Sequence, residues 1–117
     1  MADPWPTEIK VDKERTKLTV TFDDGASFAL AAELLRVLSP SAEVQGHSPA
    51  ERVTVPGKKA VRILRLEPVG NYATRIVFDD GHDTGLYTWT YLRALGETGD
   101  ARWQAYLSDL TAKGLTR

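Results

Sequence analysis

The sequence of 117 residues contains no cysteine, which excludes disulfide bonds, thiolate metal ligands and a cysteine nucleophile. It also lacks an excess of charge of either sign, because 15 Lys and Arg residues stand against 16 Asp and Glu residues. Without a positive excess there is no bulk attraction to nucleic acid or to an anionic membrane. Arg62, Arg65 and Arg75 could form a local basic stripe, but the balance of charge predicts no nucleic-acid partner.

Long apolar runs are missing as well, and none approaches the roughly 20 residues that a helix needs to cross a bilayer. The segment from Met1 to Pro6 lacks the basic and then apolar pattern of a secretory signal. We therefore expect a cytoplasmic protein without a membrane anchor.

Hydrophobic residues make up 42% of the chain, which is enough for one core and predicts a single domain over residues 1–117.

A four-residue segment occurs twice in the chain, as Phe22-Asp23-Asp24-Gly25 and as Phe78-Asp79-Asp80-Gly81. Each copy follows an apolar run that contains β-favouring residues, and Asp-Gly favours the tight turn of a β-hairpin. A helical pattern follows each hairpin, one ending near Leu38 and the other around Gly96. The echo indicates either a duplication or a common solution to the same packing problem.

The remaining segments predict a further strand and a C-terminal helix. The strand is expected over residues 61–66, and Asp100 is a good N-cap for a helix that ends at Gly114. Apolar residues fall at helical spacing in this last segment, namely Trp103, Tyr106, Leu107 and Leu110. We expect them to cover a sheet face. The predicted fold is α+β, a small two-layer sandwich with a mostly antiparallel sheet of about five strands and a C-terminal covering helix.

The two copies differ just after the turn, where His82 and Asp83 take the place of Ala26 and Ser27. Imidazole and carboxylate groups are both good zinc ligands, so this position is a candidate divalent-metal site. A polar hairpin tip in water is the alternative interpretation.

A second candidate site follows the first helix. Glu43 and His47 are four residues apart, which places both side chains on one face if the segment is helical. Gly46 favours termination of that turn, so a short capped turn with solvated polar residues is the alternative. Ser39 and Pro40 predict such a turn, with Ser39 as its N-cap.

Aromatic residues are dense around the second hairpin. Tyr72, Tyr87 and Trp89 are candidates for a recognition surface that combines apolar area with hydrogen-bonding groups. If Trp89 packs inward, at least one of Tyr87 and Tyr91 is expected to face outward. Ordinary core packing is the alternative.

Motifs of catalysis are absent from the sequence. Ser39 and Ser41 lack the Gly-x-Ser-x-Gly context of a nucleophile elbow, and no phosphate-binding loop or dinucleotide fingerprint occurs. No catalytic residue is assigned, and the sequence favours a non-catalytic module over an enzyme.

Three ordered segments resemble a known family: Ser39–His47, Glu67–Ala73 and Phe78–Trp89. They are similar to a bacterial family of unassigned function that is related to the N-terminal domain of gamma-butyrobetaine hydroxylase. The resemblance covers about residues 7 to 96. Such domains occur alone, fused to Mrp-type ATPases of iron–sulfur cluster assembly, or before the oxygenase domain. The resemblance therefore implies an accessory module with a protein partner, for which an Mrp-type ATPase or an oxygenase is a candidate.

The resemblance also implies a comparison with a structural zinc site. In the hydroxylase, three cysteines and a histidine bind zinc, and the matching positions here are Ser39, Ser41, Val44 and His82. Serine and valine are not useful zinc ligands, so the site is not inherited intact. We expect that Glu43, His47, His82 and Asp83 could instead hold zinc or another divalent cation. The alternative function is a small metal-dependent enzyme that uses this His and carboxylate site.

Overall fold

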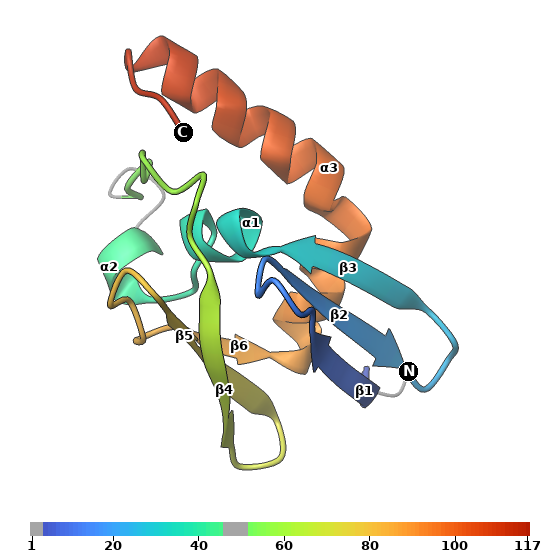
Figure 1. Ribbon diagram of the computed structural model, residues 1–117. Helices are drawn as coiled ribbons and strands as arrows, with labels where there is room; N and C mark the ends of the chain where they lie inside the picture. The colour runs from blue at the N-terminus through green and yellow to red at the C-terminus, as the bar shows by residue number, and fades with distance from the viewer. Residues whose placement is uncertain (1–3, 46–51) are drawn as a thin grey trace.

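The computed structural model of the chain describes residues 4–45 and 52–117 (Figure 1). The elements follow in the order β1 (Pro6–Val11), β2 (Lys17–Phe22), β3 (Ser27–Ala31), α1 (Ala32–Val37), α2 (Ala42–Gln45), β4 (Ile63–Val69), β5 (Ala73–Phe78), β6 (Leu86–Thr88) and α3 (Trp89–Ala112). The strands form two antiparallel sheets, in the orders β1-β2-β3 and β4-β5-β6. The α+β class and the C-terminal helix are confirmed, while the strands divide into two sheets where we expected one.

Both halves of the chain use the same hairpin turn. Gly25 and Gly81 have φ angles of +90° and +92°, which residues with a side chain rarely adopt. The N–H of Gly25 donates to the carbonyl of Phe22, and the N–H of Gly81 donates to the carbonyl of Phe78. The two Asp-Gly hairpins that the sequence predicts are therefore present.

The helix of each half also begins in the same way. The N–H of Ala32, at the start of α1, donates to the carbonyl of Thr16. The N–H of Trp89, at the start of α3, donates to the carbonyl of Tyr72. Both carbonyls belong to the connection between the first two strands of their own half. The echo in the sequence thus corresponds to a repeated unit of three strands and a helix.

Two ion pairs connect the two halves of the molecule. Asp24, in the first hairpin, pairs with Arg93 of α3 at 3.0 Å. Asp80, in the second hairpin, pairs with Arg36 of α1 at 2.7 Å. Each half therefore supplies the carboxylate for one pair and the guanidinium for the other.

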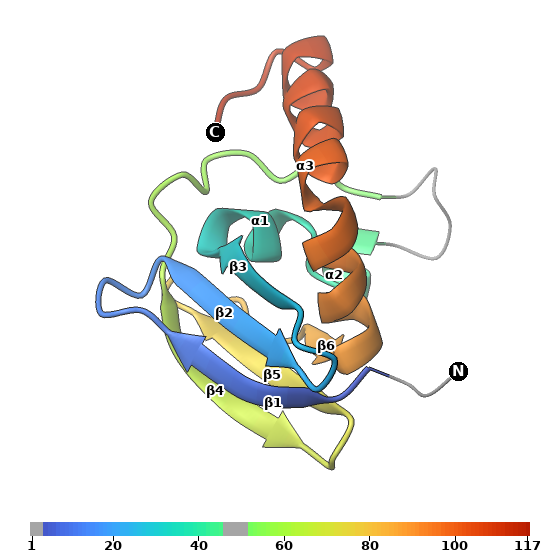
Figure 2. The same cartoon turned by 90° about the vertical axis from the view of Figure 1, so that its right-hand side faces the viewer.

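The core lies between the two sheets, which Figure 2 shows one in front of the other. Its fully buried side chains come from both sheets and from both main helices: Leu18, Val20, Phe22, Leu35, Ile63, Ile76, Phe78, Tyr87, Leu92 and Leu95. Because one core is shared, neither sheet buries its apolar face alone.

Helix α3 is continuous over 24 residues, where we expected two helices separated near Gly96 and Asp100. The prediction of a break was wrong, because Gly96 does not cap a helix. A Cβ atom at Gly96 would lie 2.4 Å from the ring of Phe28, so glycine permits close packing of α3 against β3.

Among the described residues, α3 and the other helices lack the apolar length required to cross a membrane.

The second half of α3 extends beyond the sheets (Figure 1). Its buried residues Tyr106 and Leu110 cluster with Val37 of α1, and Trp103 and Leu107 pack partly buried against that cluster, as do Leu38 and Val55. The expectation that these four residues cover a sheet face was wrong for Tyr106, Leu107 and Leu110, whereas Trp103 also packs against the core between the sheets. Helix α3 is longer than the sheets, so its second half covers α1 and the segment around Val55 instead.

Candidate functional site

His82 is a buried histidine at the second hairpin, with 6% of its surface exposed. Its Nε2 lies 2.8 Å from Ser39 Oγ, and its Nδ1 lies 3.3 Å from Glu43 Oε2. An ionised carboxylate can only accept, so Nδ1–H donates to Glu43 and Nε2 accepts from the Ser39 hydroxyl. The expected proximity of Ser39 and Glu43 to His82 is therefore found.

The segment that carries Ser39 and Glu43 is ordered by its own hydroxyl groups. The N–H of Ser41 donates to Ser39 Oγ, and the N–H of Glu43 donates to Ser41 Oγ, both at 3.2 Å. Ser41 Oγ also lies 2.7 Å from Thr84 Oγ1 of the second hairpin. The short helix α2 thus exists, but it begins at Ala42, beyond the start that we expected at Pro40.

The chain Ser39–His82–Glu43 has the connectivity of a hydrolase triad, in which a histidine links a hydroxyl to a carboxylate. Burial and the positive charge of Arg36 lower the pKa of His82 below 6.5, although Glu43 partly opposes this shift. The neutral imidazole is the form that a general base requires. Ser39 has no exposed surface, however, so a substrate has no access to its hydroxyl. The arrangement supports a structural role.

Asp80, two residues before His82, is the most strongly paired carboxylate of this region. Arg36 Nε and Lys58 Nζ lie 2.7 and 2.6 Å from its Oδ2. Partial burial alone would raise the pKa of Asp80, but hydrogen bonds from Lys58, the His82 backbone and Arg36 lower it from 3.8 to about 2. Asp80 is therefore an ionised anchor between α1, the segment around Lys58 and the second hairpin.

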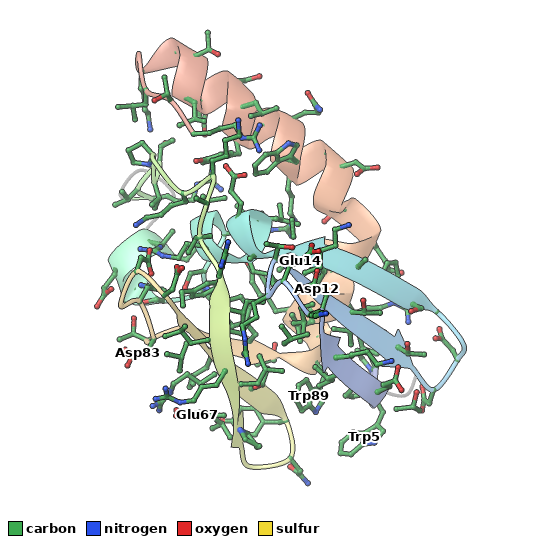
Figure 3. The ribbon with its side chains drawn as sticks, viewed as in Figure 1. Trp5, Asp12, Glu14, Glu67, Asp83 and Trp89 are labelled. Atoms are coloured by element: carbon green, nitrogen blue, oxygen red, sulfur yellow. The ribbon has the colours of Figure 1, made fainter. Side chains whose placement is uncertain are left out.

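The expected metal ligands do not form a complete set among the described residues. Glu43 contacts His82, but both ring nitrogens of His82 are already engaged within the chain. Asp83 is exposed at the edge of the molecule (Figure 3), and His47 lies outside the described residues. Within residues 4–45 and 52–117, no three His, Asp or Glu side chains converge as a cation site.

The four positions that match the zinc ligands of the hydroxylase likewise do not fit the metal. Ser39 and Ser41 use their hydroxyls in the hydrogen bonds described above, and Val44 contributes only a buried apolar side chain. Hydroxyls in hydrogen bonds and methyl groups are not zinc ligands. The residues here build a hydrogen-bonded junction at the corresponding place, and no metal chemistry follows from them.

A different kind of site lies at the junction of the β4–β5 turn, the start of α3 and the residues before β1. Trp5, Tyr72 and Trp89 line a hollow of about 420 Å³. Figure 3 shows Trp5 and Trp89 on the same side of the molecule. Trp5 and Tyr72 are 50% and 51% exposed, and Trp89 is half-buried. We call the hollow that these three residues line the aromatic hollow.

Tyr87, which we expected in the same recognition surface, belongs to the core. It is fully buried, and its hydroxyl donates to the carbonyl of Leu35 at 2.5 Å. Its pKa is raised above the usual value of 10 by burial. The expectation that Tyr87 faces a partner was therefore wrong, whereas Tyr72 and Trp89 reach the surface. Trp5 was missed, because an isolated tryptophan between prolines gives no periodic signal.

These features define a small α+β domain with two similar halves, a buried polar junction and an exposed aromatic hollow. The chain belongs to the gamma-butyrobetaine hydroxylase-like, N-terminal family, whose model matches residues 9–93. A comparison with curated proteins finds no match.

Solved structures of similar proteins support the fold. Two NMR solution structures share 47% and 43% identity with the chain, with TM-scores of 0.84 and 0.86. The alignments cover 98% and 99% of this chain, and 86% and 91% of those proteins. A crystal structure from Acidithiobacillus ferrooxidans, of a DUF971 family protein of unknown function, shares 36% identity with a TM-score of 0.66. That alignment covers 81% of this chain and 98% of the other.

Proposed function

We propose that the chain is a non-catalytic binding module that docks a protein partner on the aromatic hollow. The observation that carries this proposal is that three aromatic side chains, two of them about half exposed, meet in one hollow whose described lining residues are all uncharged. Exposed aromatic residues of this kind supply large apolar contact area together with hydrogen-bonding groups, as interface hot spots do.

The hollow is held in shape before a partner arrives. The indole N–H of Trp89 donates to the carbonyl of Asn71 at 2.9 Å, and its backbone N–H donates to the carbonyl of Tyr72. The ring of Tyr72 lies over Gly70, where an added Cβ would be 3.1 Å from the ring. Because these side chains are already positioned, binding loses little conformational entropy.

The lining also indicates the chemistry of the occupant. It contains Asn71, Thr88 and Thr90 besides the aromatic residues and Pro4, so the lining within residues 4–45 and 52–117 offers no charged group for an ion pair. An uncharged, apolar segment of a partner protein fits this surface, with hydrogen bonds at its rim. The Mrp-type ATPase suggested by the family resemblance is the first partner to test, which would link the module to iron–sulfur cluster assembly. An oxygenase is the second.

The test is a titration of the purified chain with a purified Mrp-type ATPase from the same cell. The double variant Trp5→Ala with Tyr72→Ala is expected to weaken binding by about 100-fold, as loss of two hot-spot residues does. Leu64→Ala is the matched control, because Leu64 is an exposed apolar residue that does not line the hollow. Circular dichroism checks that each variant is folded. If neither the ATPase nor an oxygenase partner binds, or if the double variant binds as tightly as the control, the proposal is wrong.

A further inference from the structure

A second cavity lies between β3 of the first half and the middle of α3 of the second half. It has a volume of about 560 Å³ and is lined by the whole of β3, by Glu33 and Leu34 of α1, by Arg117, and by six residues of α3, namely Leu95, Gly96, Glu97, Gly99, Asp100 and Trp103. We call it the β3–α3 groove. It shares no lining residue with the aromatic hollow. Its size falls within the usual range of ligand-binding clefts.

One wall of the groove is the open edge of a sheet. β3 pairs with β2 on one side, and among the described strands none pairs with its other side. In Figure 2, β3 lies on the side of its sheet that faces α3. Unpaired N–H and C=O groups of an edge strand can take up an extended peptide segment by strand addition. The register positions available are those of Ser27–Ala31.

The end of the groove holds a buried carboxylate. The Glu33 side chain is only 8% exposed, and it forms two hydrogen bonds with Arg117. Nη2 of Arg117 lies 2.7 Å from Oε1, and Nε lies 3.0 Å from Oε2. The guanidinium also lies over the ring of Trp103, 5.2 Å from its centroid. A buried carboxylate and an aromatic face together form a receptor for arginine.

Arg117 is more exposed to solvent than the receptor that it occupies. Its side chain is 42% exposed, against 8% for Glu33. The residues from Thr111 to Arg117 are all exposed. A buried carboxylate requires a cationic partner, and this segment supplies one from within the chain. Another arginine, arriving along the groove, can take the same position without leaving Glu33 uncompensated.

We propose that the β3–α3 groove binds an extended, arginine-containing segment of a partner protein, which pairs with β3 and replaces Arg117 on Glu33 and Trp103. The charges agree with this occupant. Among the residues that the structure describes, the lining carries the carboxylates Glu33, Glu97 and Asp100, with Arg117 as the basic residue. Glu97 also pairs with Arg93, outside the groove, at 3.2 Å. Once Arg117 leaves, the charged side chains of the described lining are acidic, and they favour a cationic segment.

The experiment uses a blocked pentapeptide, acetyl-Thr-Val-Arg-Val-Thr-amide, and the same peptide with citrulline in place of arginine. Citrulline keeps the shape of arginine but lacks its charge. The full chain with Arg117→Gln is titrated by calorimetry and followed by amide NMR shifts. We expect the arginine peptide to bind about tenfold or more tightly than the citrulline peptide, because its hydrogen bonds are charge-assisted. The amide shifts are expected in residues 27–31 and 95–103.

Two further variants locate the effect. The unsubstituted chain is expected to bind the arginine peptide about fivefold more weakly than Arg117→Gln, because its own arginine competes. Adding Glu33→Gln to Arg117→Gln is expected to remove the preference for arginine over citrulline. Adding Glu67→Gln, a carboxylate on β4 outside the groove, is expected to leave that preference unchanged.

The proposal is overturned if the two peptides bind Arg117→Gln equally, or if neither binds at about 5 mM, a concentration that detects even weak complexes. It is also overturned if the preference for arginine survives Glu33→Gln. The variant Trp5→Ala with Tyr72→Ala serves as a separate control. Since it alters only the aromatic hollow, it is expected to bind the arginine peptide normally, so the two proposals fail independently.

Discussion

His82 occupies a hairpin position that makes no demand on its side chain. The carbonyl of His82 accepts from the N–H of Phe78, just as the carbonyl of Ala26 accepts from the N–H of Phe22 in the first hairpin. Alanine and histidine therefore serve the turn equally well. The imidazole is explained by its contacts with Ser39 and Glu43, which connect the second hairpin to the segment around α2.

This environment predicts a pH dependence of stability. Burial, followed by the charge of Arg36, lowers the pKa of His82 in the folded state below 6.5. The folded state thus favours the neutral form, and its contribution is complete above pH 6.5 and is lost as pH falls through the folded pKa. Urea unfolding between pH 8 and pH 5 is expected to show a decline in the unfolding free energy that His82→Gln reduces. Parallel curves for both proteins would contradict this assignment.

Asp80 and Asp24 are equivalent carboxylates that differ in their partners. Asp80 has Arg36, Lys58 and the His82 backbone, and its pKa is about 2, so its contribution is present above pH 4 and is lost as pH falls toward 2. Asp80→Asn is expected to cost about 1 kcal/mol at pH 7 after allowance for solvent screening, and to cost little near pH 2. Asp24→Asn, at an exposed position, is expected to cost less at pH 7. Thermal melts at both pH values measure the difference, and an equal effect of the two variants would argue against the role of Asp80.

The hydrogen-bonded junction also predicts that folding is independent of metal. Ser39, Ser41 and Val44 offer no zinc ligand, and His82 is satisfied by protein groups. Dialysis against EDTA or phenanthroline is therefore expected to leave the melting temperature unchanged, and added zinc is expected to leave it unchanged as well. A fall of several degrees on chelation, restored by zinc, would show that the described residues are completed by a ligand outside them.

Single residues also show why the aromatic surface could be predicted only in part. We expected that, if Trp89 packs inward, at least one of Tyr87 and Tyr91 faces outward. Trp89 is half-buried at the start of α3, and Tyr91 is also partly buried, because its hydroxyl donates to the carbonyl of Leu38. Tyr87 points into the core, where its hydroxyl has a carbonyl partner in Leu35. Tyr72 reaches the surface because it lies in the turn between β4 and β5.

At the level of elements, the two glycines of α3 have different roles. Both lower helix propensity, which is why the sequence indicated a break in the helix. Gly96 lies against the ring of Phe28, whereas a Cβ at Gly99 would lie 3.7 Å from Leu34, an ordinary contact. Periodicity along one segment contains no information on the distance to another element. The continuous helix therefore depends on packing that the sequence pattern does not reveal.

These contacts predict opposite effects of the same substitution. Gly96→Ala is expected to destabilise the fold by about 1–3 kcal/mol, because the new methyl group overlaps the Phe28 ring. Gly99→Ala is expected to stabilise it by up to about 1 kcal/mol, because alanine favours the helix. Urea unfolding of the two variants gives both free energies. Equal stabilisation by both would show that α3 does not approach β3 as closely as the structure indicates.

Strand β1 was not predicted by the sequence analysis. Residues 7–11 alternate, and they follow two prolines, Pro4 and Pro6. Proline is compatible with the first residue of an edge strand, which is the place of Pro6 in β1. The burial of the side chains follows this alternation only weakly, since Ile9 and Val11 are only partly buried and lie at the margin of the core.

At the scale of the whole molecule, the local elements could be predicted better than their assembly. Alternation in β2 and the Asp-Gly turns identify the hairpins, because both signals are local. Which strands share a sheet depends on pairing between distant segments, and one sheet or two satisfies the same alternation. The reciprocal pairs Asp24–Arg93 and Asp80–Arg36 show how the halves combine, but neither pair is apparent from sequence spacing.

This interlocked assembly predicts that the two halves unfold together. Leu18 of β2 and Leu92 of α3 are both fully buried in the shared core, although they belong to different halves. Leu18→Ala and Leu92→Ala are each expected to lower the unfolding free energy by about 2–5 kcal/mol while one cooperative transition remains. Leu86→Ala, at an exposed position, is the control and is expected to cost less than about 1 kcal/mol.

Coincidence of the transitions can be measured by far-ultraviolet circular dichroism and by tryptophan fluorescence. Hydrogen exchange adds a test for each sheet, because β2 and β5 are expected to lose protection by the same free energy in either variant. The reason is structural: exposure of one sheet removes the apolar face that covers the other and breaks both reciprocal ion pairs. If Leu18→Ala released β2 while β5 kept its full protection, the halves would be independent units, and the shared core would not account for the stability of the fold.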